Sequence, residues 1–140
     1  MKDENLNVAA GWVEKAESDL KNAAHTLRLG DQCPTDTVAF HAQQCVEKYL
    51  KALFVFSDTD FPRTHSIAVL WRLLQAPDRP ELTAEEQERL TDYATVTRYP
   101  GDYEPIPLDE TRWAVRVARR VRGQARKLLP AEVIRLSRRR

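Results

Sequence analysis

The sequence has few of the residues that mark several common classes of protein. Only four of its 140 residues are glycine, and no glycine-rich loop that could cradle a phosphate occurs. Its two cysteines, Cys33 and Cys45, cannot form a disulfide framework and match no metal-ligand spacing. The N-terminus lacks the apolar segment of an export signal, so we expect both cysteines to be reduced thiols in a cytoplasmic protein. The longest apolar run, residues 52–56, is far shorter than the roughly 20 residues that cross a bilayer.

Histidine is also scarce. The three histidines are His25, His41 and His65, and none belongs to a Glu-x-x-His pair of the kind that holds metal in helical bundles. No cysteine–histidine motif indicates a catalytic nucleophile either. We therefore expect no metal centre and no cofactor.

An excess of charge of one sign is lacking as well, since 22 basic and 21 acidic residues give a net charge of +1. The average hides an asymmetry. Residues 1–110 carry 11 basic and 20 acidic side chains, whereas residues 111–140 carry 11 basic side chains and one acidic side chain, Glu132. An acidic body with a basic C-terminal end indicates a surface for a charged partner.

The sequence does contain clear helical periodicity. Hydrophobic residues make up 42% of the chain, and their steps of three and four predict helices over about residues 7–29, 35–56, 65–75, 84–98 and 109–129. Gly30 is expected to end the first helix, Thr35 or Asp36 to cap the second, and Thr83 with Glu86 to form a capping box. The predicted fold is all-α, an antiparallel bundle of four to five helices in residues 1–130, followed by a basic C-terminal tail, residues 131–140. Five apolar residues of the last helix are expected to face inward: Trp113, Val117, Val121, Ala125 and Leu128.

The second predicted helix carries a specific motif, Phe40-His41-Ala42-Gln43 followed by Glu47-Lys48 and Lys51-Ala52-Leu53. Gln43, Glu47 and Lys51 lie four residues apart, so they share one helix face. This string resembles the signature helix of the HEPN (higher eukaryotes and prokaryotes nucleotide-binding) domain family. The resemblance covers about residues 8–128, because further matches occur at Trp12…Ser18-Asp19-Leu20, at His65-Ser66 and at Arg98-Tyr99-Pro100.

The resemblance implies a helical bundle that pairs into a homodimer and binds nucleotide or nucleic acid. It also implies a small nucleotidyltransferase as partner, in a toxin–antitoxin or stress system. Some members of the family are metal-independent ribonucleases, in which an arginine is followed after four to six residues by a histidine. There the arginine holds a phosphate and the histidine acts as acid or base.

This sequence departs from the ribonuclease motif after Arg98. Tyr103 stands five positions on, where a histidine would serve, and no histidine follows His65. Tyrosine titrates near pH 10 and is a poor proton shuttle at neutral pH. We therefore expect no catalytic residues of this kind, and ribonuclease activity with an altered motif remains only as an alternative.

Two groups of residues are candidates for binding nucleotide or nucleic acid. The first is Arg98, Tyr99, Asp102 and Tyr103, which combine a cation with rings on which a base could stack. In the competing interpretation the tyrosines pack the loop onto the bundle and Arg98 pairs with Asp102 or Glu104. The second group comes from the less apolar side of the second helix: His41, Gln44, Lys48 and Lys51. These side chains line a dimer cleft in one interpretation and form a solvated or dimer-packing face in the other, while Asp19 is expected to form a surface salt bridge.

The last predicted helix carries a row of arginines spaced by threes and fours. The row consists of Arg112, Arg116, Arg119 and Arg126, with Arg122 beside it. Such a row could contact phosphates. It could instead face the acidic remainder of the bundle or an acidic protein, and basic residues near a helix C-terminus also suit the helix dipole.

Overall fold

A computed structural model describes residues 3–95 and 104–139, and within them the fold is entirely helical. The predicted all-α class is thereby confirmed, with one more helix than the four to five expected. The helices are α1 (Asp3–Leu27), α2 (Thr35–Phe56), α3 (Ile67–Leu73), α4 (Ala84–Thr95), α5 (Leu108–Leu128) and α6 (Ala131–Arg138). A short 3-10 turn, Gly30–Gln32, lies between α1 and α2. None of the described helices is long and apolar enough to span a membrane.

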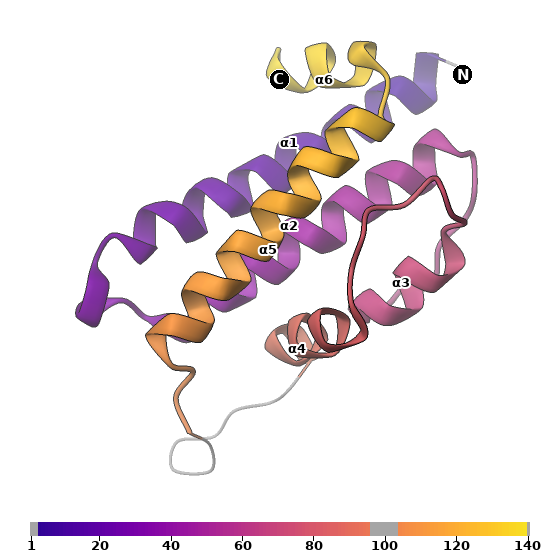
Figure 1. The fold of residues 1–140 in the computed structure, drawn as a ribbon. Coiled ribbons are helices and arrows are strands. Elements are labelled where there is room, and N and C mark those ends of the chain that lie inside the picture. The colour runs from indigo at the N-terminus through magenta and orange to yellow at the C-terminus, as the bar shows by residue number, and fades with distance from the viewer. Residues whose placement is uncertain (1–2, 96–103, 140) are drawn as a thin grey trace.

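Helix α2 is the centre of the bundle. It packs most extensively on α1 and also contacts α3, α4 and α5. Figure 1 shows α1, α2 and α5 as three long helices lying side by side, with the short helices α3 and α4 at one flank. The contacts of α2 with four other helices explain why many of its side chains are enclosed, including fully buried Tyr49, Leu50 and Phe54.

The connection between α1 and α2 follows the sequence in one respect and departs from it in another. Gly30 adopts the left-handed conformation expected of it, with φ of 59°. The prediction that Thr35 or Asp36 caps α2 is wrong, because Pro34 occupies the N-cap position and no side chain caps that end. Thr35 and Asp36 already lie inside the first turn.

The start of α3 differs from the prediction for a local reason. The helix was expected to start at His65, but Ser66 is its N-cap and accepts a hydrogen bond from the amide of Val69 at 3.2 Å. His65 therefore precedes the helix and is free to turn toward α2.

The capping box at the start of α4 is confirmed. The Glu86 amide donates to Oγ1 of Thr83 at 3.1 Å, and the Thr83 amide donates to Oε1 of Glu86 at 2.9 Å. The predicted end of this helix near Arg98 lies outside the described residues.

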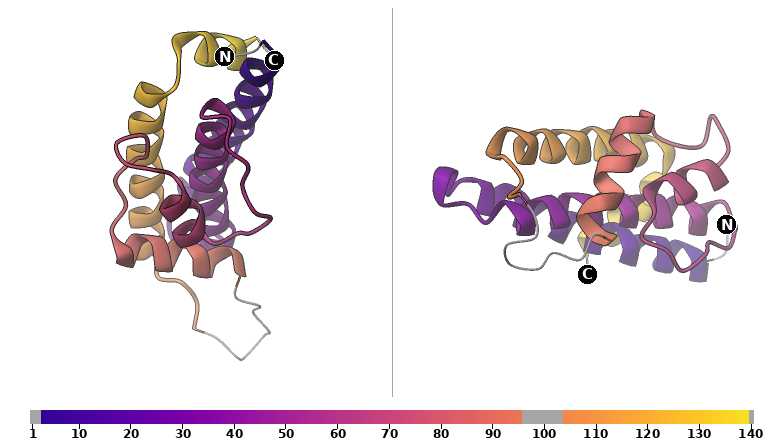
Figure 2. Two further views of the ribbon diagram at one scale, coloured as in Figure 1. Left: turned by 90° about the vertical axis from the view of Figure 1, so that its right-hand side faces the viewer. Right: turned by 90° about the horizontal axis from the view of Figure 1, so that it is seen from below.

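Helix α5 buries Val117, Val121 and Ala125 as predicted, whereas Trp113 and Leu128 are only partly buried. Pro130 then separates α5 from α6. The segment that the sequence set apart as a basic tail forms α6 over most of its length, and this helix packs on α1 with Val133 fully buried. Figure 2 shows α6 lying across the end of the bundle.

Candidate nucleotide and nucleic-acid interface

The first group of predicted binding residues cannot be placed. Arg98, Tyr99, Asp102 and Tyr103 all lie outside the described residues. The second group and the arginine row are both described, and they show how the polar residues of α2 and α5 are used.

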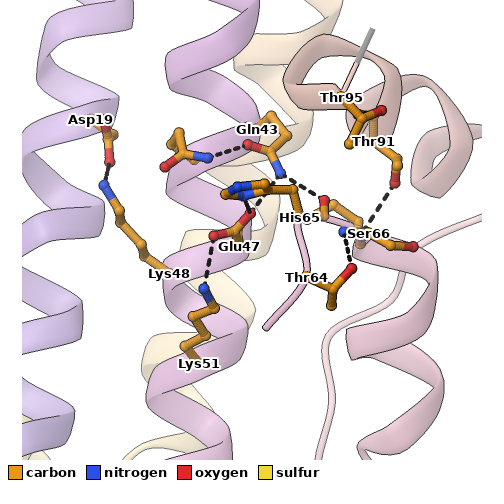
Figure 3. A network of polar contacts seen from close by, with 12 residues as sticks. Asp19, Gln43, Glu47, Lys48, Lys51, Thr64, His65, Ser66, Thr91 and Thr95 are labelled. Carbon is orange, nitrogen blue, oxygen red and sulfur yellow. Dashed lines mark hydrogen bonds and ion pairs between the residues drawn. The ribbon is translucent and has the colours of Figure 1, made fainter. Parts of the chain in front are cut away.

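Glu47 is the centre of a polar network between α2 and the segment before α3. Its Oε1 accepts from Nε2 of Gln43 at 3.0 Å and lies 3.0 Å from Nδ1 of His65, and its Oε2 accepts from Nζ of Lys51 at 2.9 Å. Gln43 also donates to the backbone carbonyl of His65 at 3.1 Å. Figure 3 shows these side chains converging on Glu47 from both segments. Gln43 and Glu47 thus join α2 to the segment before α3, and Lys51 pairs with Glu47 within α2.

The environment of Glu47 keeps its carboxylate ionised. The side chain is only 3% exposed, and burial alone would raise its pKa. The hydrogen bonds from Gln43, Lys51 and His65 outweigh burial, so the pKa of Glu47 lies below its ordinary value. The Lys51 ammonium also lies 5.2 Å from the ring centroid of Trp12. Lys51 is therefore held inside the protein by a carboxylate and by an aromatic face.

Asp19 joins α1 to α2. Its Oδ1 lies 2.7 Å from Nδ1 of His41, and its Oδ2 accepts from Nζ of Lys48 at 2.5 Å. Asp19 is 8% exposed, so the salt bridge is largely buried rather than on the surface as the sequence suggested. Gln44 donates to Oε1 of Gln43 at 2.7 Å. The structure thus brings His41 and Lys48 together on one carboxylate and places Gln44 and Lys51 in the Glu47 network.

The arginine row of α5 divides into two parts. Arg112, Arg116 and Arg119 are exposed and form no ion pair with any described residue. Arg122 and Arg126 turn toward α1 and pair with Glu17. The interpretation that the row faces the acidic part of the bundle is therefore confirmed for Arg122 and Arg126. Contact of the three exposed arginines with phosphates stays a prediction.

Glu17 is the anchor for the second part of the row. Arg122 forms a bidentate ion pair with Glu17, in which Nε donates to Oε2 at 2.8 Å and Nη2 donates to Oε1 at 2.9 Å. The Tyr49 hydroxyl donates to Oε2 at 2.7 Å from α2. Although burial pushes the pKa of Glu17 upward, the hydrogen bonds from Arg122 and Tyr49 hold that pKa below its ordinary value. One carboxylate thus ties α1, α2 and α5 together.

Sequence reasoning missed Arg120, which lies on the other side of the row. Its guanidinium donates to both carboxylate oxygens of Glu86, from Nη2 to Oε1 at 2.6 Å and from Nη1 to Oε2 at 2.8 Å. Glu86 is also the capping-box residue of α4, so this pair joins α5 to the start of α4. The capping box marked Glu86 in the sequence, but nothing there showed which helix would face it.

Metal-ligating clusters and cysteines were the other groups considered in the sequence. No cluster of three or more metal-ligating side chains occurs in the described part of the chain. Cys33 and Cys45 are both buried, and burial raises the pKa of the Cys45 thiol strongly. A protonated, enclosed thiol is a poor nucleophile.

Comparison with known proteins agrees with this architecture. The protein named "Putative toxin MJ1304" of Methanocaldococcus jannaschii is 29% identical over 107 residues, which cover 71% of this chain and 68% of that protein. The crystal structure of TT1696 from Thermus thermophilus superposes with a TM-score of 0.71 at 26% identity, covering 88% of this chain and 99% of that one. The structure of ST0689, an archaeal HEPN homologue, gives a TM-score of 0.66 at 25% identity, covering 92% and 100%.

The HEPN domain family itself matches residues 9–129. That range runs from the first turns of α1 through the end of α5, and it includes the α2 motif that makes the Glu47 network. This chain belongs to the HEPN domain family.

Proposed function

We propose that this HEPN-domain protein pairs into a homodimer and binds nucleotide or nucleic acid without cutting it. We further propose that it is a toxin-like component that works with a small nucleotidyltransferase in a toxin–antitoxin or stress system. The name of the Methanocaldococcus jannaschii relative supports the toxin-like role. The family's association with nucleotidyltransferases supports the partner.

The observation that carries the binding role is the exposed part of the arginine row. Arg112, Arg116 and Arg119 point to solvent without an ion pair among the described residues, although the body of the protein is rich in carboxylates. Arg112 and Arg119 are seven residues apart on one helix, or roughly 10 Å at 1.5 Å per residue. Arginines in such a row match the repeating phosphates of a nucleic-acid strand, and each phosphate neutralised adds a salt-dependent contribution to affinity.

The incomplete ribonuclease motif supports binding without cleavage. No histidine follows Arg98, so the ribonuclease motif of the family is incomplete. His65 lies against Glu47, and His41 lies against Asp19. Each of these two histidines therefore has a carboxylate partner, and neither follows Arg98 in the sequence as the motif requires.

One observation favours ribonuclease activity as a second candidate. The half-buried His41 ring, 23% exposed, is oriented by Asp19 through Nδ1 at 2.7 Å. A histidine oriented by a carboxylate is the arrangement of a general base, and its second ring nitrogen is then available for a substrate. A His41→Asn variant tests this candidate directly, because asparagine cannot act as a base.

The proposed function is tested with the full chain, a labelled single-stranded RNA with a 5′-hydroxyl end, and a chelator. We expect binding in a mobility-shift assay and an intact RNA on a denaturing gel. Arg112→Ala/Arg116→Ala should weaken binding and lower the slope of log affinity against log salt by about 1.4, at about 0.7 per phosphate contact on single strands.

A matched control removes two exposed arginines elsewhere. Arg63→Ala/Arg72→Ala makes the same change in net charge, and its affinity should remain that of the unmodified protein. An equal loss in both variants would overturn the row as the binding surface. Cleavage that disappears in Arg98→Ala or His41→Asn would overturn the non-cutting role.

The homodimer has its own test. Exposed Phe40, 40% accessible beside His41 on α2, is an apolar group that a partner copy would cover. Light scattering at micromolar concentration should give twice the chain mass of 16.1 kDa. A monomer mass would overturn the dimer.

The nucleotidyltransferase partner is tested by co-expressing this protein with a nucleotidyltransferase encoded by a neighbouring gene and testing whether the two co-purify.

A further inference from the structure

A pocket of about 480 Å³ opens where α1, α5 and α6 meet. Four of its eight lining residues are basic, two are glutamates and two are serines. The basic side chains are Lys21, Arg122, Arg126 and Arg138. Since the glutamates are Glu14 and Glu17, the lining carries a net charge of +2. Figure 1 shows the three helices that form this end of the bundle.

A second hollow lies beside the pocket, between α1 and α5. This hollow, of about 420 Å³, shares Glu17, Lys21 and Arg122 with the first and adds Arg119. Helix α1 packs more extensively on α2 than on α5, which leaves room for a groove on that side. The positive side chains thus line two neighbouring hollows that share Lys21 and Arg122.

Glu17 holds the arginines of the pocket in place without using all of their hydrogen-bond donors. Arg122 contacts Glu17 through Nε and Nη2, so its Nη1 group has no partner among the described residues. Arg126 reaches Glu17 and the Tyr49 hydroxyl only through Nη1, at 3.5 and 3.4 Å. A guanidinium has five N–H donors, so both arginines keep donors for a ligand. A pre-positioned guanidinium loses less conformational freedom when it binds an anion.

The lining indicates which part of a ligand the pocket recognises. Arginine binds phosphate oxygens in pairs, and lysine adds a point charge. None of the eight described residues that line the pocket is aromatic, so no ring is available on which a base would stack. The volume lies within the roughly 300–1,000 Å³ of small-molecule sites and exceeds the needs of one phosphate group.

We infer that this pocket binds an oligophosphate group, which is the di- or triphosphate moiety of a nucleotide or of the 5′ end of an RNA strand. The inference rests on the proposed function and deepens it, because it names the chemical group of the ligand and a second site for it, apart from Arg112 and Arg116. Lys21 and Arg138, from α1 and α6, complete the positive wall opposite α5.

Calorimetric titration with inorganic tripolyphosphate, without added metal, tests the inference on the full chain. Lys21→Gln/Arg138→Gln removes two exposed cations of the pocket without disturbing the Glu17 network. Its affinity should fall about tenfold or more, since a charged hydrogen bond contributes about 1.5–3 kcal/mol. The matched control Arg63→Gln/Arg72→Gln makes the same change in net charge on other segments, and its affinity should stay within about twofold.

Three results would overturn the pocket: no binding by the unmodified protein, an equal loss in both double variants, or an unchanged affinity in the pocket variant. ATP should bind within a few-fold of tripolyphosphate, because no ring holds the base. Tighter binding of a short RNA with a 5′-triphosphate would identify an RNA end as the source of the same group. Failure of this pocket and failure of the proposed RNA surface can be told apart. The RNA used above carries no 5′-phosphate, and the protein variants of that test change Arg112 and Arg116 rather than Lys21 and Arg138.

Discussion

Replacing Glu47 by glutamine should lower the free energy of unfolding by about 3 kcal/mol at neutral pH. Glutamine keeps the shape of the side chain but removes the charge that pairs with Lys51, and it cannot accept all three hydrogen bonds. Breaking a buried ion pair costs about 3–5 kcal/mol. We expect the lower end, because the Lys51 side chain is 12% exposed and keeps its contact with the ring of Trp12.

Urea denaturation followed by circular dichroism, at one fixed protein concentration, measures this loss. The control is Glu88→Gln, an exposed glutamate on α4, which should change stability by no more than about 0.5 kcal/mol. Lys51→Met and the double variant complete a cycle in which the coupling energy should be about 2 kcal/mol. A loss below about 1 kcal/mol in Glu47→Gln, or strictly additive losses, would refute the role of Glu47 as the buried anchor of α2.

The pH dependence of the same pair of proteins gives an independent check. The folded-state pKa of Glu47 lies below its ordinary value, so its ionised form stabilises the protein fully above about pH 4.3, the value in an unfolded chain. That stabilisation is lost as the pH falls through the lower folded pKa. The stability difference between the unmodified protein and Glu47→Gln should therefore narrow in acid. A difference that stays constant down to about pH 3 would contradict the depressed pKa.

Three further predictions rest on single contacts. Thr83→Ala should lower the free energy of unfolding by about 1 kcal/mol, because the first turn of α4 loses its capping hydroxyl; no change in the urea midpoint would contradict the cap. Tyr49→Phe should cost about 1 kcal/mol, since the ring stays buried while Glu17 loses one of its donors, and a loss above about 3 kcal/mol would mean that the hydroxyl does more. Cys45 should resist a thiol reagent in the native protein and react only on unfolding, because burial raises the pKa of its thiol; rapid labelling under native conditions would contradict its enclosure.

The helices were predictable because their apolar spacing records which side of each helix is buried. Val117, Val121 and Ala125 face the core of α5 for this reason. Boundaries were less predictable, since they depend on which group caps the first amides. The N-cap of α3 is Ser66, so the helix begins after the expected start at His65. The N-cap of α2 is Pro34 rather than Thr35 or Asp36.

The α2 motif shows the limit of local pattern more clearly. Its spacing correctly placed Gln43, Glu47 and Lys51 on one face of the helix. It could not show that this face is turned inward, because the third donor to Glu47 is His65, 18 residues further along the chain. Periodicity gives the direction of a side chain relative to its own helix, whereas the element that it meets is set by the tertiary fold.

The arginines of α5 differ in whether the fold explains them. Arg126 lies in the last turn, where the helix dipole favours a cation, and it also meets Glu17, so folding alone accounts for it. Arg112 and Arg116 lie in the first half of the helix, where the helix dipole does not stabilise a cation. They also have no carboxylate partner among the described residues. Neither the helix dipole nor an ion pair with a carboxylate therefore explains Arg112 and Arg116. A chain whose net charge is only +1 thus pairs the arginines that face its own helices and keeps unpaired ones at the surface, which is the charge pattern that the proposed binding of a phosphate backbone requires.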